Sequence, residues 1–144
     1  MTVEIIVSAN PTEAERQAIL APLLAYNSEK AGPSGYEQVG ILIRDSETQD
    51  VIGGLWGKIS YHWLFVELLC LPPQLRGQDI GTQLLIDVEK VARQKNCVGI
   101  WLDSFSFQAP KFYMKNGYEV FGTLDDHPRG SQRFFLRKRL DTPA

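Results

Sequence analysis

The sequence contains few of the residues that build metal sites and disulfide frameworks. Its 144 residues include two cysteines, Cys70 and Cys97, and two histidines, His62 and His127, with no CxxC pair among them. A structural zinc ion needs four ligands, and two separate thiols do not make a disulfide scaffold. We therefore expect no metal.

Long apolar runs and an excess of positive charge are also missing. Every apolar stretch is far shorter than the roughly 20 residues that span a bilayer, and Glu4 stands where a signal peptide would need basic residues. The net charge is -2 and the pI about 5.7, whereas nucleic-acid affinity depends on many lysines and arginines. We expect a cytoplasmic protein that binds neither membranes nor nucleic acids.

The apolar content is sufficient for one hydrophobic core. Hydrophobic residues make up 44% of the chain and aromatic residues 10%. Because no Pro/Gly/Ser-rich or low-complexity linker divides the sequence, we expect a single domain over residues 1–144, with its core at about 3–140.

Local patterns predict the order β-α-βββ-α-β-α-ββ. The alternating, β-branched segment Thr2 to Ser8 predicts a strand, and Asn10-Pro11-Thr12 the start of a helix. Pro22 should kink or split this helix before Gly32-Pro33 ends it. The other predicted strands are 39–44, 51–60, 63–71, 98–103, 118–124 and 133–140, and the other predicted helices are 80–96 and 108–115.

Two of these strands and the long helix form a predicted βαβ unit. The strands at 63–71 and 98–103 should be parallel neighbours, because a crossover helix joins them. The fold class is α/β (α+β), with about seven mostly antiparallel strands, a central parallel pair (the fourth and fifth strands) and flanking helices. Ligands favour the C-terminal ends of such parallel strands.

The segment from Pro73 to Thr82, at the start of the long helix, has the features of an anion site. It contains two glycines, Gly77 and Gly81, and one arginine, Arg76. Free N–H groups and the helix dipole at a helix N-terminus suit a pyrophosphate. An ordinary strand-to-helix turn is the alternative.

Two motifs at this point resemble those of the GNAT acetyltransferase superfamily. The family pattern Arg/Gln-x-x-Gly-x-Gly/Ala is matched by Arg76-Gly77-Gln78-Asp79-Ile80-Gly81, although Asp79 stands where the family usually has glycine. A second pattern matches Ala109, Tyr113, Lys115, Gly117 and Tyr118. The resemblance, including the order of elements, extends from about Val3 to Leu140.

The resemblance implies a GNAT fold, a homodimer by analogy, and binding of acetyl-CoA as co-substrate. The pantetheine arm would pair with the backbone of Leu69, Cys70 and Leu71, and backbone N–H groups near Leu69 or Cys70 would meet the oxyanion. The pyrophosphate would be held by Arg76, Gly77, Gln78, Asp79, Ile80, Gly81 and Thr82. An inward Asp79 would compete for the same N–H groups as a helix cap, so we favour an outward side chain.

Acetyl transfer to an amine needs a base and an acid. Glu67 is the candidate base because it interrupts an apolar strand, although a solvent-facing Glu is an equal alternative. Tyr113 occupies the family's acid position, since a phenol with a pKa near 10 stays protonated at pH 7; the alternative is a packing role. Whether Glu67 acts directly or through water stays open.

The acceptor is expected to be the primary amine of a small molecule. Candidate contacts are Tyr26, Trp56, Tyr61 and Asp125, because aromatic faces and carboxylates favour a cationic amine. Core packing explains the aromatic residues equally well, and a hairpin turn explains Asp125. The alternatives are a protein lysine or N-terminal acetyltransferase and a non-catalytic acyl-CoA sensor, which the departure at Asp79 keeps open.

Overall fold

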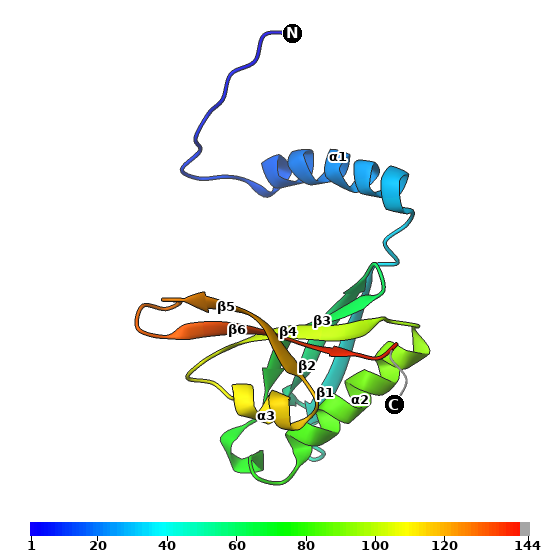
Figure 1. The fold of residues 1–144 in the computed structure, drawn as a ribbon, viewed down its shortest axis with the longest axis vertical. Coiled ribbons are helices and arrows are strands. Elements are labelled where there is room, and N and C mark those ends of the chain that lie inside the picture. The colour runs from blue at the N-terminus through cyan, green and yellow to red at the C-terminus, as the bar shows by residue number, and fades with distance from the viewer. Residues whose placement is uncertain (142–144) are drawn as a thin grey trace. The chain divides into compact units, whose positions relative to one another are not determined.

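The computed structural model describes residues 1–141 and divides into two compact units (Figure 1). The first comprises Met1–Ser34 and the second begins at Gly35. None of the helices in the described residues is long and apolar enough to cross a membrane.

The first unit contains one helix, α1 (Glu13–Ala31). Thr12 caps it as predicted: the Glu15 N–H donates to the Thr12 hydroxyl at 3.1 Å, and the Thr12 N–H donates to the Glu15 carboxylate at 2.8 Å. This reciprocal pair is a capping box, which satisfies N–H groups that a helix end leaves open.

Two expectations about the first unit were wrong. Residues 2–8 form no strand, because alternation gives only a propensity and a strand needs a partner, which this unit does not contain. Helix α1 also continues through Pro22 without a break. Proline removes one hydrogen bond, to the carbonyl of Ala18; Ala18 is exposed, so water can satisfy that group.

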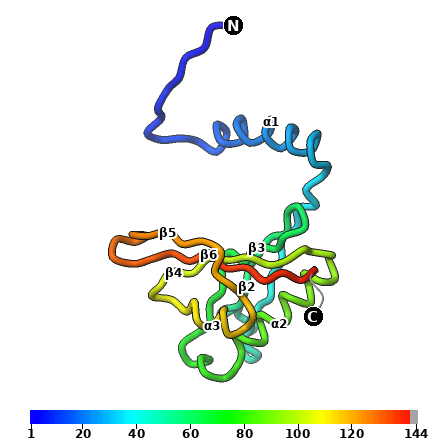
Figure 2. Tube along the Cα trace, viewed as in Figure 1, coloured from blue at the N-terminus to red at the C-terminus, as the bar shows by residue number. Residues whose placement is uncertain are grey.

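The second unit is built on one sheet with two flanking helices. Its strands are β1 (Glu37–Arg44), β2 (Val51–Ser60), β3 (Trp63–Cys70), β4 (Gly99–Phe105), β5 (Glu119–Asp125) and β6 (Gln132–Arg139). Its helices are α2 (Ile80–Gln94), α3 (Pro110–Lys115) and a 3-10 turn at Pro73–Leu75. The described residues give six strands in the order β1-β2-β3-β4-β6-β5, one fewer than predicted because residues 2–8 do not join the sheet. Figure 2 traces this path.

The predicted parallel pair is confirmed as β3 and β4, connected through α2 (Figure 1). The other four strand pairs are antiparallel. Pairing of β3 with β4 runs from Trp63↔Gly99 to Val66↔Leu102 and then stops, although both strands continue.

The core lies on one face of this sheet. Leu64, Ile100 and Leu136 are fully buried, and they cluster with Leu84 and Val88 of α2. The opposite face carries an aromatic group from four strands, comprising Trp63, Phe65, Trp101, Phe121 and Phe135. Side chains alternate along a strand, so residues two apart from Phe65 or Trp101 also belong to this aromatic face.

Candidate functional site

The C-terminal halves of β3 and β4 face each other without pairing. Among the described residues, 68–70 of β3 pair only with β2, residue 67 pairs with neither neighbouring strand, and 103–105 of β4 pair only with β6. We call this opening between residues 67–70 and 103–105 the wedge. Its unpaired backbone groups can bond an extended chain carrying amides as an added strand would, and the pantetheine arm of acetyl-CoA is such a chain.

The segment predicted to hold the pantetheine arm borders the wedge. Leu69 packs on the core cluster, as does Leu71 just beyond the strand, and this fixes the backbone there. Cys70 is exposed between them. These residues can therefore offer backbone groups from a rigid position. Their contact with the pantetheine arm stays a prediction.

The predicted pyrophosphate loop leads into the N-terminus of α2. Gly77 has φ +79°, a left-handed conformation that favours glycine, and no atom lies within 4 Å of a Cβ added there. The Gln78 side chain donates to the Gln74 carbonyl at 3.1 Å, which folds the loop back on itself. At Gly81 an added Cβ would come within 3.1 Å of Phe112 and 3.3 Å of Leu71. Gly81 therefore permits close packing between α2 and α3.

Asp79 caps α2 in an unusual way. Its φ of +61° lies in the left-handed region, which aspartate tolerates better than most residues. Its side chain makes no cap hydrogen bond; only its carbonyl joins the helix, accepting from the Gln83 N–H at 3.1 Å. The first N–H groups of a helix have no partner within it, so those of Ile80, Gly81 and Thr82 remain open to an anion. With exposed Arg76 nearby in sequence, the loop fits a pyrophosphate.

Glu67 is the extra residue of a β-bulge. Trp56 of β2 pairs with Leu68 and Gly57 pairs with Val66, so Glu67 has no partner of its own. Its carboxylate lies 3.5 Å from Nζ of Lys58, which also lies 5.8 Å from the centre of the Phe65 ring. Glu67 thus points to the aromatic face at the start of the wedge. Bulges often re-aim a side chain beside an active site.

Tyr113 lies on α3, half-buried against the core cluster. Loss of water around the ring and, second, the negative charge of Asp103 raise the pKa of the Tyr113 phenol above its usual value. The phenol therefore keeps its proton at neutral pH, as a general acid must. Its ring packs against Phe112 and Tyr118 at centroid distances of 5.2 and 6.1 Å.

Asp103 is a residue that the sequence reasoning passed over. It lies on β4 at the wedge and accepts a hydrogen bond from Nε of Arg133 at 3.0 Å, and its other oxygen forms an ion pair with a terminal nitrogen of Arg133 at 2.8 Å. A signal for it was available: Asp103 ends the predicted strand, and ligands gather at the C-terminal ends of parallel strands.

The four candidate acceptor residues do not all lie together. Trp56 is exposed on β2 near the bulge, whereas Tyr61 lies in the turn before β3, at the end of that strand away from Glu67. Tyr26 belongs to α1, in the first unit. The structure thus brings Trp56, but not Tyr61, close to the Glu67 bulge.

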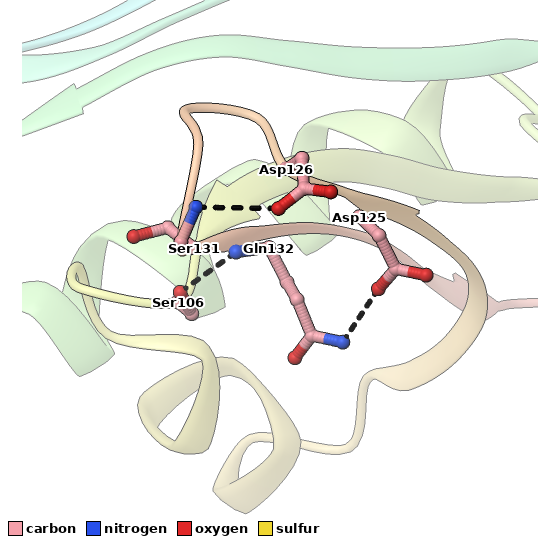
Figure 3. A pocket seen from close by; sticks show the side chains of 6 residues that line it. Ser106, Asp125, Asp126, Ser131 and Gln132 are labelled. Carbon is pink, nitrogen blue, oxygen red and sulfur yellow. Dashed lines mark hydrogen bonds between the residues drawn. The ribbon is translucent and has the colours of Figure 1, made fainter.

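Asp125 lines a pocket of about 470 Å³ at the β5–β6 hairpin (Figure 3). It accepts a hydrogen bond from the Gln132 side chain at 2.9 Å, and Asp126 accepts one from the Gly130 N–H at 3.3 Å. Ser106, just beyond β4, accepts from the Gln132 N–H at 3.0 Å. These contacts hold the hairpin together, so Asp125 has a structural role, and its contact with an acceptor stays a prediction.

Comparisons with known proteins agree with this geometry. A curated acetyltransferase of Agrobacterium fabrum is 37% identical over 128 residues, which cover 89% of this chain and 92% of that protein. Blasticidin-S acetyltransferase of Streptomyces morookaense is 35% identical over 95 residues, or 65% of this chain and 70% of the relative. A crystal structure described as a putative acetyltransferase from Agrobacterium tumefaciens has a TM-score of 0.90 and 33% identity, covering 96% of this chain and all of that one.

The family model described as the acetyltransferase (GNAT) family matches residues 9–118, which include the bulge, the wedge, the α2 loop and Tyr113. The predicted resemblance is therefore confirmed, and the chain belongs to the GNAT family of acetyltransferases.

Proposed function

We propose that this acetyltransferase moves the acetyl group of acetyl-CoA to the primary amine of a small molecule by direct attack, with the whole chain, 1–144, serving as one N-acetyltransferase domain. The observation that carries the proposal is the wedge, which has a bulged carboxylate at its start and unpaired backbone groups along both sides. The relative that acts on blasticidin S, a small molecule, supports this acceptor class over a protein substrate.

Each residue at the site has a distinct task. Bound acetyl-CoA supplies a thioester for the amine to attack and a thiolate to leave. Glu67 accepts a proton from the incoming ammonium, since an alkyl amine with a pKa near 10.4 is charged at pH 7. Backbone N–H groups near Leu69 or Cys70 stabilise the negative charge that develops on the carbonyl oxygen. Tyr113 gives a proton to the leaving sulfur as the C–S bond breaks. The second proton that the attacking nitrogen loses on forming the amide passes to solvent, from which Tyr113 recovers its own.

The cofactor is held by two different parts of the second unit. Gly77 to Thr82 and Arg76 take the pyrophosphate through N–H groups and positive charge, and Leu69 to Leu71 take the pantetheine arm. The Asp79 side chain makes no cap hydrogen bond and so leaves those N–H groups available. This arrangement supports a working transferase over a non-catalytic sensor.

A thiol-release assay tests the proposal. Purified protein with acetyl-CoA is given spermidine, tyramine, agmatine, free amino acids and short peptides in parallel, and free CoA is measured. We expect release with at least one small amine. Release with peptides alone would favour a protein acetyltransferase, and binding of acetyl-CoA without release would favour a sensor.

We also propose a cytoplasmic homodimer. Acetyl-CoA is a cytoplasmic metabolite, which supports the location. The homodimer is proposed by analogy with the family. Light scattering measures the mass in solution, and a monomer at micromolar concentration would contradict the proposal.

A further inference from the structure

Each strand of the wedge carries a carboxylate just beyond the last pair of the parallel register. Phe65 pairs with Trp101 and Val66 with Leu102, so the next residues along the two strands are Glu67 and Asp103. The Phe65 and Trp101 rings stack at 4.1 Å between centroids, so the side chains of this pair meet on the aromatic face just before the strands separate. The salt bridge of Glu67 with Lys58, and that of Asp103 with Arg133, lie on the same face.

The two carboxylates are held very differently. Glu67 has a single contact, 3.5 Å from Lys58, and the two side chains are 35% and 42% exposed. Both oxygens of Asp103 contact Arg133, one through a hydrogen bond from Nε and one through an ion pair, and these side chains are only 19% and 29% exposed. A forked pair is stronger and better oriented than a single exposed contact.

Arg133 is itself fixed by the aromatic residues around it. Its guanidinium lies 5.7 Å from the centre of the Phe105 ring and 5.3 Å from that of Phe135. Asp103 therefore stays in place, while Glu67 is free to exchange Lys58 for another cation. The charge of Asp103 also reaches Tyr113, which connects this carboxylate with the proposed acid.

We propose that Asp103 is an acceptor-binding residue: with Glu67 it holds the ammonium group of the acceptor above the Phe65–Trp101 stack. The inference rests on the proposed function and specifies its substrate class. The Arg133 fork uses one lone pair on each carboxylate oxygen, so the remaining lone pairs of Asp103 can accept from an ammonium.

This arrangement selects against one class of amine. A carboxylate attached beside the ammonium, as in a free α-amino acid, would be brought up to Glu67 and Asp103 and repelled. The preferred acceptor is therefore a primary amine whose neighbouring carbon carries no carboxylate. Tyramine should be favoured over tyrosine, and agmatine over arginine.

Steady-state kinetics with these two pairs tests the inference. Asp103→Asn keeps the shape of the side chain and one oxygen that can accept from Arg133, but it removes the charge and replaces the second oxygen by an NH2 donor. We expect KM for tyramine or agmatine to rise about tenfold, equivalent to about 1.4 kcal/mol, with kcat changed less than about threefold. Asp103→Glu, which keeps the charge, should recover much of the affinity and the selectivity against amino acids.

Glu119→Gln is the matched control. It removes the carboxylate from the Arg137–Glu119 ion pair, 3.1 Å long, on the same sheet but away from the wedge. Its KM should stay within about twofold of the wild type. The thermal shift with acetyl-CoA should persist in all three variants, which shows that they fold and bind cofactor.

Two outcomes are decisive and distinct. Thiol release by the wild type with an unchanged KM in Asp103→Asn, or equal use of tyrosine and tyramine, would overturn this inference alone. Absence of release with every amine would overturn the proposed function and this inference together.

Discussion

Two neighbouring tyrosines allow the proposed acid to be tested against a close internal control. The rings of Tyr113 and Tyr118 are 6.1 Å apart, and the Tyr118 N–H donates to the Tyr113 carbonyl at 3.1 Å. Tyr118 is only 4% exposed, and its hydroxyl has no hydrogen-bond partner among the described residues. Replacing each by phenylalanine removes the same hydroxyl from two different settings.

The expected effects separate activity from stability. If Tyr113 donates the proton, Tyr113→Phe lowers turnover by on the order of 10² to 10⁴ with little change in acetyl-CoA affinity. Tyr118→Phe removes a buried hydroxyl that folding has stripped of water, which should stabilise the protein by about 1 kcal/mol. For a chain of this size, that raises Tm by roughly 3 °C. Its turnover should match the wild type.

The alkaline side of the stability curve gives an independent check on Tyr118. Burial raises the pKa of the Tyr118 phenol far above the ordinary value of 10.0, the charge of Glu89 adding to the effect. Above pH 10 the folded state therefore holds a proton on Tyr118 that the unfolded state releases. The contribution of Tyr118 to the free energy of unfolding is present below pH 10 and is lost as pH rises further. Tyr118→Phe should lose less stability than the wild type between pH 10 and 11 in denaturant titrations.

One result would refute the assignment of the acid. Equal turnover in Tyr113→Phe and the wild type, measured by thiol release under saturating substrates, would make Tyr113 a packing residue like Tyr118. A large loss in both variants would instead point to a shared structural effect, because the two rings touch.

Three further measurements test the base, the loop and the cofactor. Glu67→Gln should reduce turnover most near neutral pH and less at high pH, where the amine loses its proton unaided; a loss independent of pH contradicts a base. Asp79→Gly should tighten the binding of acetyl-CoA in calorimetry by less than tenfold, or about 1.4 kcal/mol. Its Tm should be nearly unchanged, because glycine relieves the strain of the left-handed conformation but makes the unfolded chain more flexible. Tightening of a hundredfold would mean that Asp79 blocks the loop. Millimolar acetyl-CoA should raise Tm as binding to the folded state requires, and no shift would remove the central proposal.

The sequence was sufficient where local rules decide the structure. The bounds of β2 came from its strand pattern after the polar turn at 45–50, and the start of α2 came from an apolar stripe after Pro72-Pro73. The parallel pair followed from the crossover helix between its strands. The strand predicted over residues 2–8 was wrong, because a β-branched pattern indicates propensity but not whether a partner strand is present.

The site was less accessible to sequence reasoning than the fold. Motifs indicated Tyr113 and the loop at Gly77, and its place in an apolar strand indicated Glu67. The bulge that turns Glu67 toward the aromatic face depends on how β2 pairs with β3. Predicting a role for Asp103 requires the register between β3 and β4, together with its hydrogen bond to Arg133, which is 30 residues away. Contacts between distant segments of the chain leave no local pattern to read.

The wedge also bears on how long this protein persists in a cell. Its backbone groups have no partner across the gap between β3 and β4 in the described residues, so an extended ligand bound there as proposed would add hydrogen bonds that the free protein does not have. Ligand binding of this kind lowers the fraction of unfolded molecules that proteases can remove. We therefore expect the abundance of this acetyltransferase to follow the supply of acetyl groups, falling when acetyl-CoA is scarce even if its synthesis is constant.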